Sequence, residues 1–143
     1  MGLEDLIRTG RVRRETVSPA EVREVLRLAA RDLRLARKIL QEDADWGFAV
    51  AYNAVLQASR AFMFAQGYRP ASAEGHKNTF AFLLAVLGSE HEETLTYFDR
   101  MRAKRNIAIY GMAGRVVESE VRTLLGHAER FVRLIRGLIR THS

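Results

Sequence analysis

Hydrophobic residues recur at helical spacing along most of the chain. Over residues 19–42, and again over 118–140, apolar side chains fall at steps of three and four, the pattern of a helix with one buried face. Residues 43–67 are apolar on most sides, and a shorter apolar run covers 76–87. A further long stretch, residues 90–110, opens on glutamates that stabilise the start of a helix. The pattern therefore predicts four long helices and one short one.

Residue types at the ends of these stretches favour the same boundaries. Ser18, Pro19 and Glu21 have the arrangement of a capping box at the start of the first long helix. Asp43 or Asp45 can cap the second long helix. The segment YRPASAEG is predicted as a loop, and the segment GMAGR as a break before the last helix.

Short connections between long amphipathic helices are typical of an antiparallel bundle. The expected fold class is all-α, an antiparallel up-down bundle of four to five helices. A chain of 143 residues suits one domain, so residues 1–143 are expected to form a single helical domain. Within it, residues 1–17 are predicted as a short N-terminal helix followed by a basic arm.

Composition narrows the classes of function. No segment approaches the ~20 consecutive apolar residues that cross a bilayer, and the first residues lack a secretory signal pattern. The chain has no cysteine, which fits a reducing compartment, so a cytoplasmic protein without a membrane partner is expected. Its 23 basic residues against 17 acidic ones give a net charge of +6, which favours an anionic partner. Solubility alone would explain the same charge.

Motifs for metal, cofactor or serine-based chemistry are missing from the sequence. The four histidines lack metal-ligand spacing, no HExxH occurs, and without cysteine there is no thiolate ligand. Neither a glycine-rich phosphate loop nor GxSxG is present. No metal and no cofactor are therefore expected.

A row of basic residues recurs at helical steps on one face of the first long helix. Its members are Arg23, Arg27, Arg31, Arg34 and Lys38. Such a row can follow a phosphate backbone. The alternative is an ordinary solvent face that Glu24 and Asp32, both within helical reach, partly neutralise.

The stretch RAKRNIAIYG places a cation, an amide and a phenol on one predicted helix. Arg105 and Asn106 are adjacent, whereas Tyr110 lies about 140° further round the axis of a regular helix. Residues 107–109 are expected to pack into the core. Spacing alone leaves two interpretations open. In one, the three side chains face one groove. In the other, Arg105 extends to solvent or pairs with an acid such as Asp99, Asn106 faces water and Tyr110 lies at the core edge.

Three segments of the chain resemble the HEPN family (higher eukaryotes and prokaryotes nucleotide-binding domain). They are AYNAVLQASRAFMFAQGYRP, GHKNTFAFLLAVLG and RAKRNIAIYG, and the likeness covers most of the sequence. The resemblance implies a small antiparallel helical bundle that forms a homodimer. Active members of that family are metal-independent ribonucleases, commonly toxins paired with a minimal nucleotidyltransferase antitoxin. The resemblance therefore also implies an RNA or nucleotide ligand and a minimal nucleotidyltransferase protein as partner.

The family signature near the fourth helix is an arginine, a polar residue and, after three further residues, a histidine. Arg105 and Asn106 match its first two positions, and Tyr110 stands where the histidine is expected. The resemblance makes these three the candidate catalytic residues. The candidate nucleic-acid-binding residues are Arg102, Lys104, Lys77 and His76.

The tyrosine at position 110 leaves catalysis open. A phenol with a pKa of about 10 is a poor base near neutral pH, although neighbouring arginines would favour the phenolate. The leading hypothesis is therefore RNA or nucleotide binding, with metal-independent RNA cleavage as an open extension. The alternative is a non-catalytic interaction module that binds a nucleotidyltransferase and is modified by it at Tyr110. A third reading is a structural helical dimer whose charge serves solubility alone.

Overall fold

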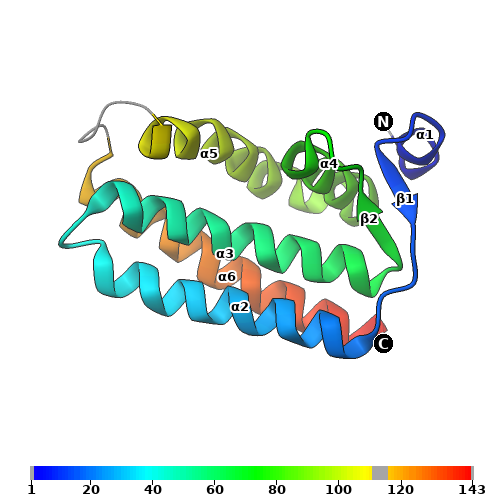
Figure 1. Ribbon diagram of the computed structural model, residues 1–143, viewed down its shortest axis with the longest axis horizontal. Coiled ribbons are helices and arrows are strands. Elements are labelled where there is room, and N and C mark those ends of the chain that lie inside the picture. The colour runs from blue at the N-terminus through cyan, green and yellow to red at the C-terminus, as the bar shows by residue number, and fades with distance from the viewer. Residues whose placement is uncertain (1, 111–115, 143) are drawn as a thin grey trace.

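The computed structural model describes residues 2–110 and 116–142, with the side chains of residues 108–110 and 142 outside that description. This part of the chain forms a helical bundle with one small pair of strands (Figure 1). The helices are α1 (Leu3–Arg8), α2 (Pro19–Ile39), α3 (Ala44–Ala65), α4 (Gly75–Leu87), α5 (Glu92–Tyr110) and α6 (Glu118–His142), with a 3-10 turn, η1 (Ser89–His91), before α5. The strands are β1 (Val12–Arg14) and β2 (Tyr68–Pro70). The predicted all-α class is confirmed.

Helix α3 lies in the centre of the bundle. Figure 1 shows α2 and α6 on one side of it and α4 and α5 on the other, and α3 contacts all four. A helix that is apolar on most sides is buried by its neighbours, and the side chains of Phe48, Tyr52 and Val55 are fully buried here. None of the described helices combines the length and apolar character needed to span a membrane.

The local signals for helix starts are confirmed. The Ser18 hydroxyl accepts a hydrogen bond from the backbone N–H of Glu21 at 3.2 Å, with Pro19 in the first turn of α2. The Asp43 carboxylate accepts one from the backbone N–H of Trp46 at 3.0 Å. Each cap satisfies an N–H group that has no partner inside its helix.

Helices α2 and α3 are in close contact near the turn that joins them. A Cβ atom added to Gly47 would lie 2.9 Å from the Cα of Leu40, closer than side-chain carbons approach backbone atoms. Gly47 is also buried. The absence of a side chain at position 47 is therefore what lets the two helices meet at this point.

The strands β1 and β2 join two segments that are far apart in the sequence. They pair antiparallel, with Val12 opposite Pro70 and Arg13 opposite Arg69 (Figure 1). The prediction of a loop was wrong for residues 68–70. Its cause is physical: the partner strand lies in the N-terminal arm, so no local hairpin signal marks the pair. The segment before that arm forms the short helix α1.

The inward face of α5 changes from apolar to basic along its length. Leu95 and Phe98 are buried, and Arg102 and Arg105 follow them at the same three-and-four spacing. Ile107 lies on the other side of the helix and is 48% exposed, so its predicted place in the core was wrong. The core ends where the arginines begin. The side chains of residues 108 and 109 lie outside the described part, as does the break predicted at 111–115.

Candidate nucleic-acid interface

A basic hollow of about 230 Å³ lies between the start of α4 and the later turns of α5. Its lining residues are Glu74, Gly75, His76, Lys77, Arg102, Arg105 and Asn106. The two segments that hold the candidate site residues, one around His76 and one around Arg105, therefore meet at one place. Four of the lining residues are basic, so the hollow is chemically suited to an anion.

Two sequence candidates are not among these lining residues. Lys104 does not line the hollow and instead forms an ion pair with Glu120 on α6. The side chain of Tyr110 lies outside the described residues, although its backbone ends α5.

Arg105 is partly buried, and its guanidinium carbon lies 5.9 Å from the centroid of the Tyr52 ring. Its Nε atom is buried and has no hydrogen-bond partner among the described residues. The alternative that Arg105 pairs with Asp99 was wrong, because Asp99 accepts a hydrogen bond from Arg102 Nε at 3.0 Å instead. A partly buried guanidinium with a buried N–H left unpaired gains most from a negatively charged ligand.

His76 is held by a hydrogen bond from the centre of the bundle. Its Nδ1 atom lies 3.2 Å from the hydroxyl oxygen of Tyr52, which is fully buried on α3. Burial raises the pKa of Tyr52, against the opposing charges of Arg102 and Arg105, so the phenol stays protonated. The direction of this hydrogen bond depends on the imidazole tautomer: when the O–H group donates to Nδ1, the neutral imidazole carries its proton on Nε2, the nitrogen left for a ligand.

The charge state of His76 depends on the same surroundings. Burial lowers its pKa, and the positive charges of Arg105, Arg102 and Arg60 lower it further. The imidazole is therefore neutral near pH 7 while the hollow is empty. A bound anion would offset the three guanidinium charges and make protonation of His76 easier.

The loop before α4 is fixed by a buried amide. Asn78 accepts a hydrogen bond from Arg11 Nε at 2.7 Å and donates one to the carbonyl oxygen of Ala73 at 3.0 Å. Glu74, at the N-cap of α4, has a left-handed backbone with φ of 54°. A non-glycine residue in this region is strained, and the strain persists because the surrounding contacts hold the loop. The first turn of α4, with His76, is thereby fixed against α3.

Sequence reasoning missed Tyr52 as a member of this site. It was one more aromatic side chain in an apolar helix, and nothing local distinguished it from the core phenylalanines. The usable signal is chemical: a tyrosine in a helix that is apolar on most sides carries a hydroxyl that needs a buried partner.

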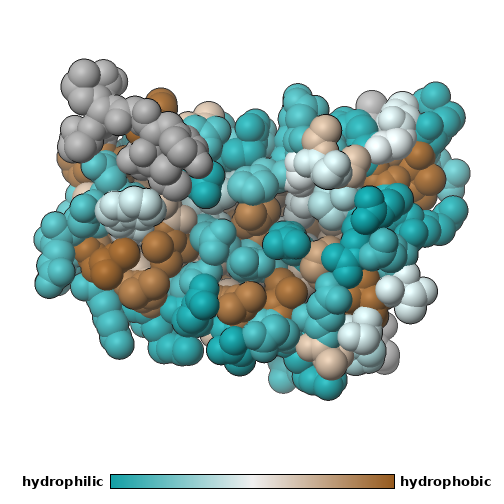
Figure 2. All heavy atoms as spheres, in the orientation of Figure 1, coloured by the Kyte–Doolittle hydropathy of each residue, from teal (hydrophilic) through white to brown (hydrophobic). Residues whose placement is uncertain are grey.

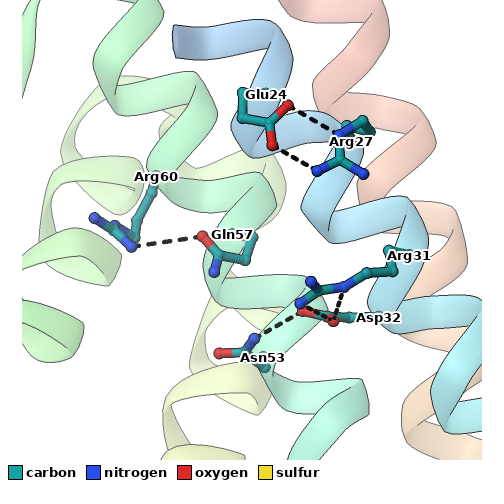
Figure 3. A network of polar contacts seen from close by, with 7 residues as sticks. All are labelled: Glu24, Arg27, Arg31, Asp32, Asn53, Gln57 and Arg60. Carbon is teal, nitrogen blue, oxygen red and sulfur yellow. Dashed lines mark hydrogen bonds and ion pairs between the residues drawn. The ribbon is translucent and has the colours of Figure 1, made fainter.

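The two arginines at the centre of the basic row on α2, Arg27 and Arg31, form ion pairs with acids of the same helix. Arg27 makes two hydrogen bonds to Glu24, and Arg31 binds the buried carboxylate of Asp32 (Figure 3). The same carboxylate accepts a hydrogen bond from the Asn53 amide at 2.7 Å, which ties α2 to α3. This geometry favours the interpretation of the row as a neutralised solvent face.

The described side chains include no group of three or more histidine, aspartate or glutamate residues that could hold a metal ion. The basic hollow, whose one acid is Glu74, is likewise unsuited to binding a cation.

Comparison with known proteins places the chain in a family. A family model for the HEPN domain matches residues 22–138, which is most of the sequence, so the protein belongs to the HEPN family. This membership indicates a nucleotide- or RNA-related function in general. A search of curated proteins found no match.

Proposed function

We propose that the protein binds RNA by placing a phosphate group in the hollow between α4 and α5. The observation that carries the proposal is Arg105, a partly buried guanidinium without a carboxylate partner among the described residues. Arginine's fork of N–H groups suits phosphate oxygens, and Arg102, Lys77 and the Nε2–H group of His76 would surround the same anion. Asn106 would contribute a neutral donor.

Metal-independent cleavage of the bound RNA is a second candidate function, which His76 favours. In such a reaction the 2′-oxygen attacks the adjacent phosphorus and gives its proton to a base, while the bond to the 5′-oxygen breaks and an acid protonates that oxygen. Histidine suits proton transfer near neutral pH, and arginines stabilise charge on the phosphate. With its proton on Nε2, His76 would be suited to the role of the acid that protonates the 5′-oxygen, although Tyr110 stands at the family's histidine position.

The oligomer and partner in this proposal follow from the family resemblance. We expect a cytoplasmic homodimer that works with a minimal nucleotidyltransferase, as in a toxin-antitoxin pair. The rival is a non-catalytic module that the partner modifies at Tyr110. One observation favours a protein partner: Trp46 is 56% exposed and Val117 is 53% exposed, on segments joined by the hydrogen bond from the Val116 N–H to Asp45. Figure 2 shows an apolar patch at the end of the bundle where α2 joins α3.

Binding of a labelled single-stranded RNA in EDTA, followed by fluorescence polarisation, tests the proposal. Arg105→Ala should weaken binding by about 1.5–3 kcal/mol, a ten- to hundredfold loss of affinity, because a charge-assisted hydrogen bond to phosphate is lost. The matched control is Arg100→Ala, which removes the same charge from an exposed position on the same helix. Equal affinity of the two variants, or no salt-sensitive binding by the wild type, would refute the proposal.

The same samples distinguish the second candidate and the rival. Gel analysis of RNA in EDTA should show cleavage by the wild type and none by Arg105→Ala if the protein is a ribonuclease. If the nucleotidyltransferase and ATP instead add mass to the wild type but not to Tyr110→Phe, and RNA is neither bound nor cut, the interaction module is the correct reading.

A further inference from the structure

A second basic hollow, of about 280 Å³, adjoins the first one. It lies between α3, β2 and the start of α4, and its basic lining residues are Arg13, Arg60 and Arg69, beside Ser72. Gly75 and His76 line both hollows. The first turn of α4 therefore separates two neighbouring hollows, each lined by basic residues.

Arg60 is the cation of the second hollow with the least compensation. It is partly buried, its polar contact is a long one of 3.5 Å to Gln57 Oε1, and it has no carboxylate partner among the described residues. Figure 3 shows it extending from α3 on the side away from α2. Arg69, by contrast, is neutralised by Glu15 and Glu21, and Arg13 forms an ion pair of 3.4 Å with Glu15 at the exposed edge of the hollow.

The two hollows belong to one electrostatic environment. The positive charges of Arg105 and Arg102 on one side, and of Arg60 on the other, all lower the pKa of His76 in addition to burial. Arg60 and Arg105 thus lie close enough to the same imidazole for each to act on it. A ligand that carried one negative charge to each side would relieve both clusters of guanidinium groups.

We propose that the second hollow is a phosphate subsite built on Arg60 and Arg13, so that the ligand is an RNA strand with consecutive phosphates on either side of His76. This inference rests on the proposed function, since it assumes that the first phosphate binds at Arg105. Phosphates along a strand are separated by a sugar, which would pass over the first turn of α4. The contiguous phosphates of a nucleoside triphosphate share bridging oxygens and would crowd a single hollow instead.

Arg60→Gln tests the subsite against Arg105→Gln, with Arg100→Gln as the matched control on an exposed part of α5. The probes are a labelled oligouridylate of about 12 nucleotides and, as competitor, 3′-UMP with its single phosphate. We expect Arg60→Gln to weaken strand binding about tenfold. Loss of one phosphate contact should also reduce the slope of log affinity against log salt by about 0.7. The affinity of Arg60→Gln for 3′-UMP, whose single phosphate would bind at Arg105, should change by less than about twofold.

A second pair of variants keeps the test independent of the fold around Arg60. Ser72 is exposed and lines the second hollow, so Ser72→Glu places a carboxylate where the phosphate would lie and should weaken strand binding. Ser72→Gln has a similar size without the charge, so Ser72→Glu should bind the strand more weakly than Ser72→Gln does.

The outcomes separate this inference from the proposed function. If Arg105→Gln weakens binding while Arg60→Gln and Ser72→Glu match their controls, the second subsite is refuted and the first stands. If Arg105→Gln also matches Arg100→Gln, the proposed function fails as well. If Arg60→Gln weakens binding of UTP as much as that of the strand, the ligand has contiguous phosphates and the strand reading is overturned.

Discussion

The hydroxyl of Tyr52 and the imidazole of His76 are joined by a hydrogen bond of 3.2 Å that connects the centre of the bundle to its basic hollow. Tyr52 belongs to the core by burial, and His76 belongs to the site by position. A substitution in the core that breaks this hydrogen bond is therefore expected to alter ligand binding in the hollow.

Tyr52→Phe should affect both stability and binding. It keeps the ring that packs against Phe80 but removes the hydroxyl that is hydrogen-bonded to His76 Nδ1. We expect a loss of about 0.5–1.5 kcal/mol in the free energy of unfolding, together with weaker RNA binding, because the imidazole is no longer fixed. Urea unfolding and fluorescence polarisation measure the two effects. Tyr97→Phe, on α5, is the control, and equal results for both variants would contradict the expectation.

Stability should depend on pH through His76. Its pKa in the folded protein lies below the ordinary value of 6.5 because of burial and three nearby arginines, so between the two pKa values the unfolded chain binds more protons. The contribution of the neutral imidazole is complete above about pH 6.5 and is lost as the pH falls through the folded-state pKa. Urea unfolding at several pH values should show this fall in the wild type and a smaller one in His76→Asn. His91→Asn serves as the control, and an unchanged pH profile in His76→Asn would count against the assignment.

Gly47→Ala should destabilise the protein. The added Cβ would lie 2.9 Å from the Cα of Leu40, and backbone cannot move away as cheaply as a flexible side chain. We expect a loss of about 1–3 kcal/mol, which thermal or urea unfolding would measure. Gly137→Ala is the matched control, because its Cβ meets nothing within 4 Å, and there alanine should stabilise α6 by about 0.5–1 kcal/mol. Identical effects at the two sites would show that close approach of the helices is not the reason.

Asp32→Ala should cost far more stability than Glu24→Ala. The Asp32 carboxylate is 2% exposed and accepts hydrogen bonds from Arg31 and Asn53, so its removal leaves the Asn53 amide without its partner. We expect a loss of about 1–3 kcal/mol for Asp32→Ala. Glu24 pairs with Arg27 at the exposed surface, where salt and water screen the interaction, and no measurable change is expected there. Comparable losses in urea unfolding would argue against a special role for the buried carboxylate.

Local chemistry made the helices predictable. The Ser18 and Asp43 caps, and Gly88 after α4, are fixed by residues within one turn of each boundary. The pairing of Val12 with Pro70 could not be predicted in the same way, because its partners meet only after the helices between them have packed.

The site was predictable from the sequence only in fragments. The family resemblance pointed to both Arg105 and His76, but their meeting in one hollow depends on how α4 and α5 pack. Tyr52 was hidden among core aromatics. Arg60 carried no signal, since an arginine near the end of an apolar helix normally reaches solvent.

The strand pair at the N-terminal arm brings a residue from outside the family match into the lining of the second hollow. The family match spans residues 22–138, so Arg105 and His76 fall within the shared framework, whereas Arg13 comes from the preceding segment that β1 clips onto β2. The first hollow is thus lined entirely by residues within the family match, whereas the second also needs a residue from the strand that precedes that match. A substitution at position 13 therefore alters the lining of the second hollow and leaves that of the first unchanged.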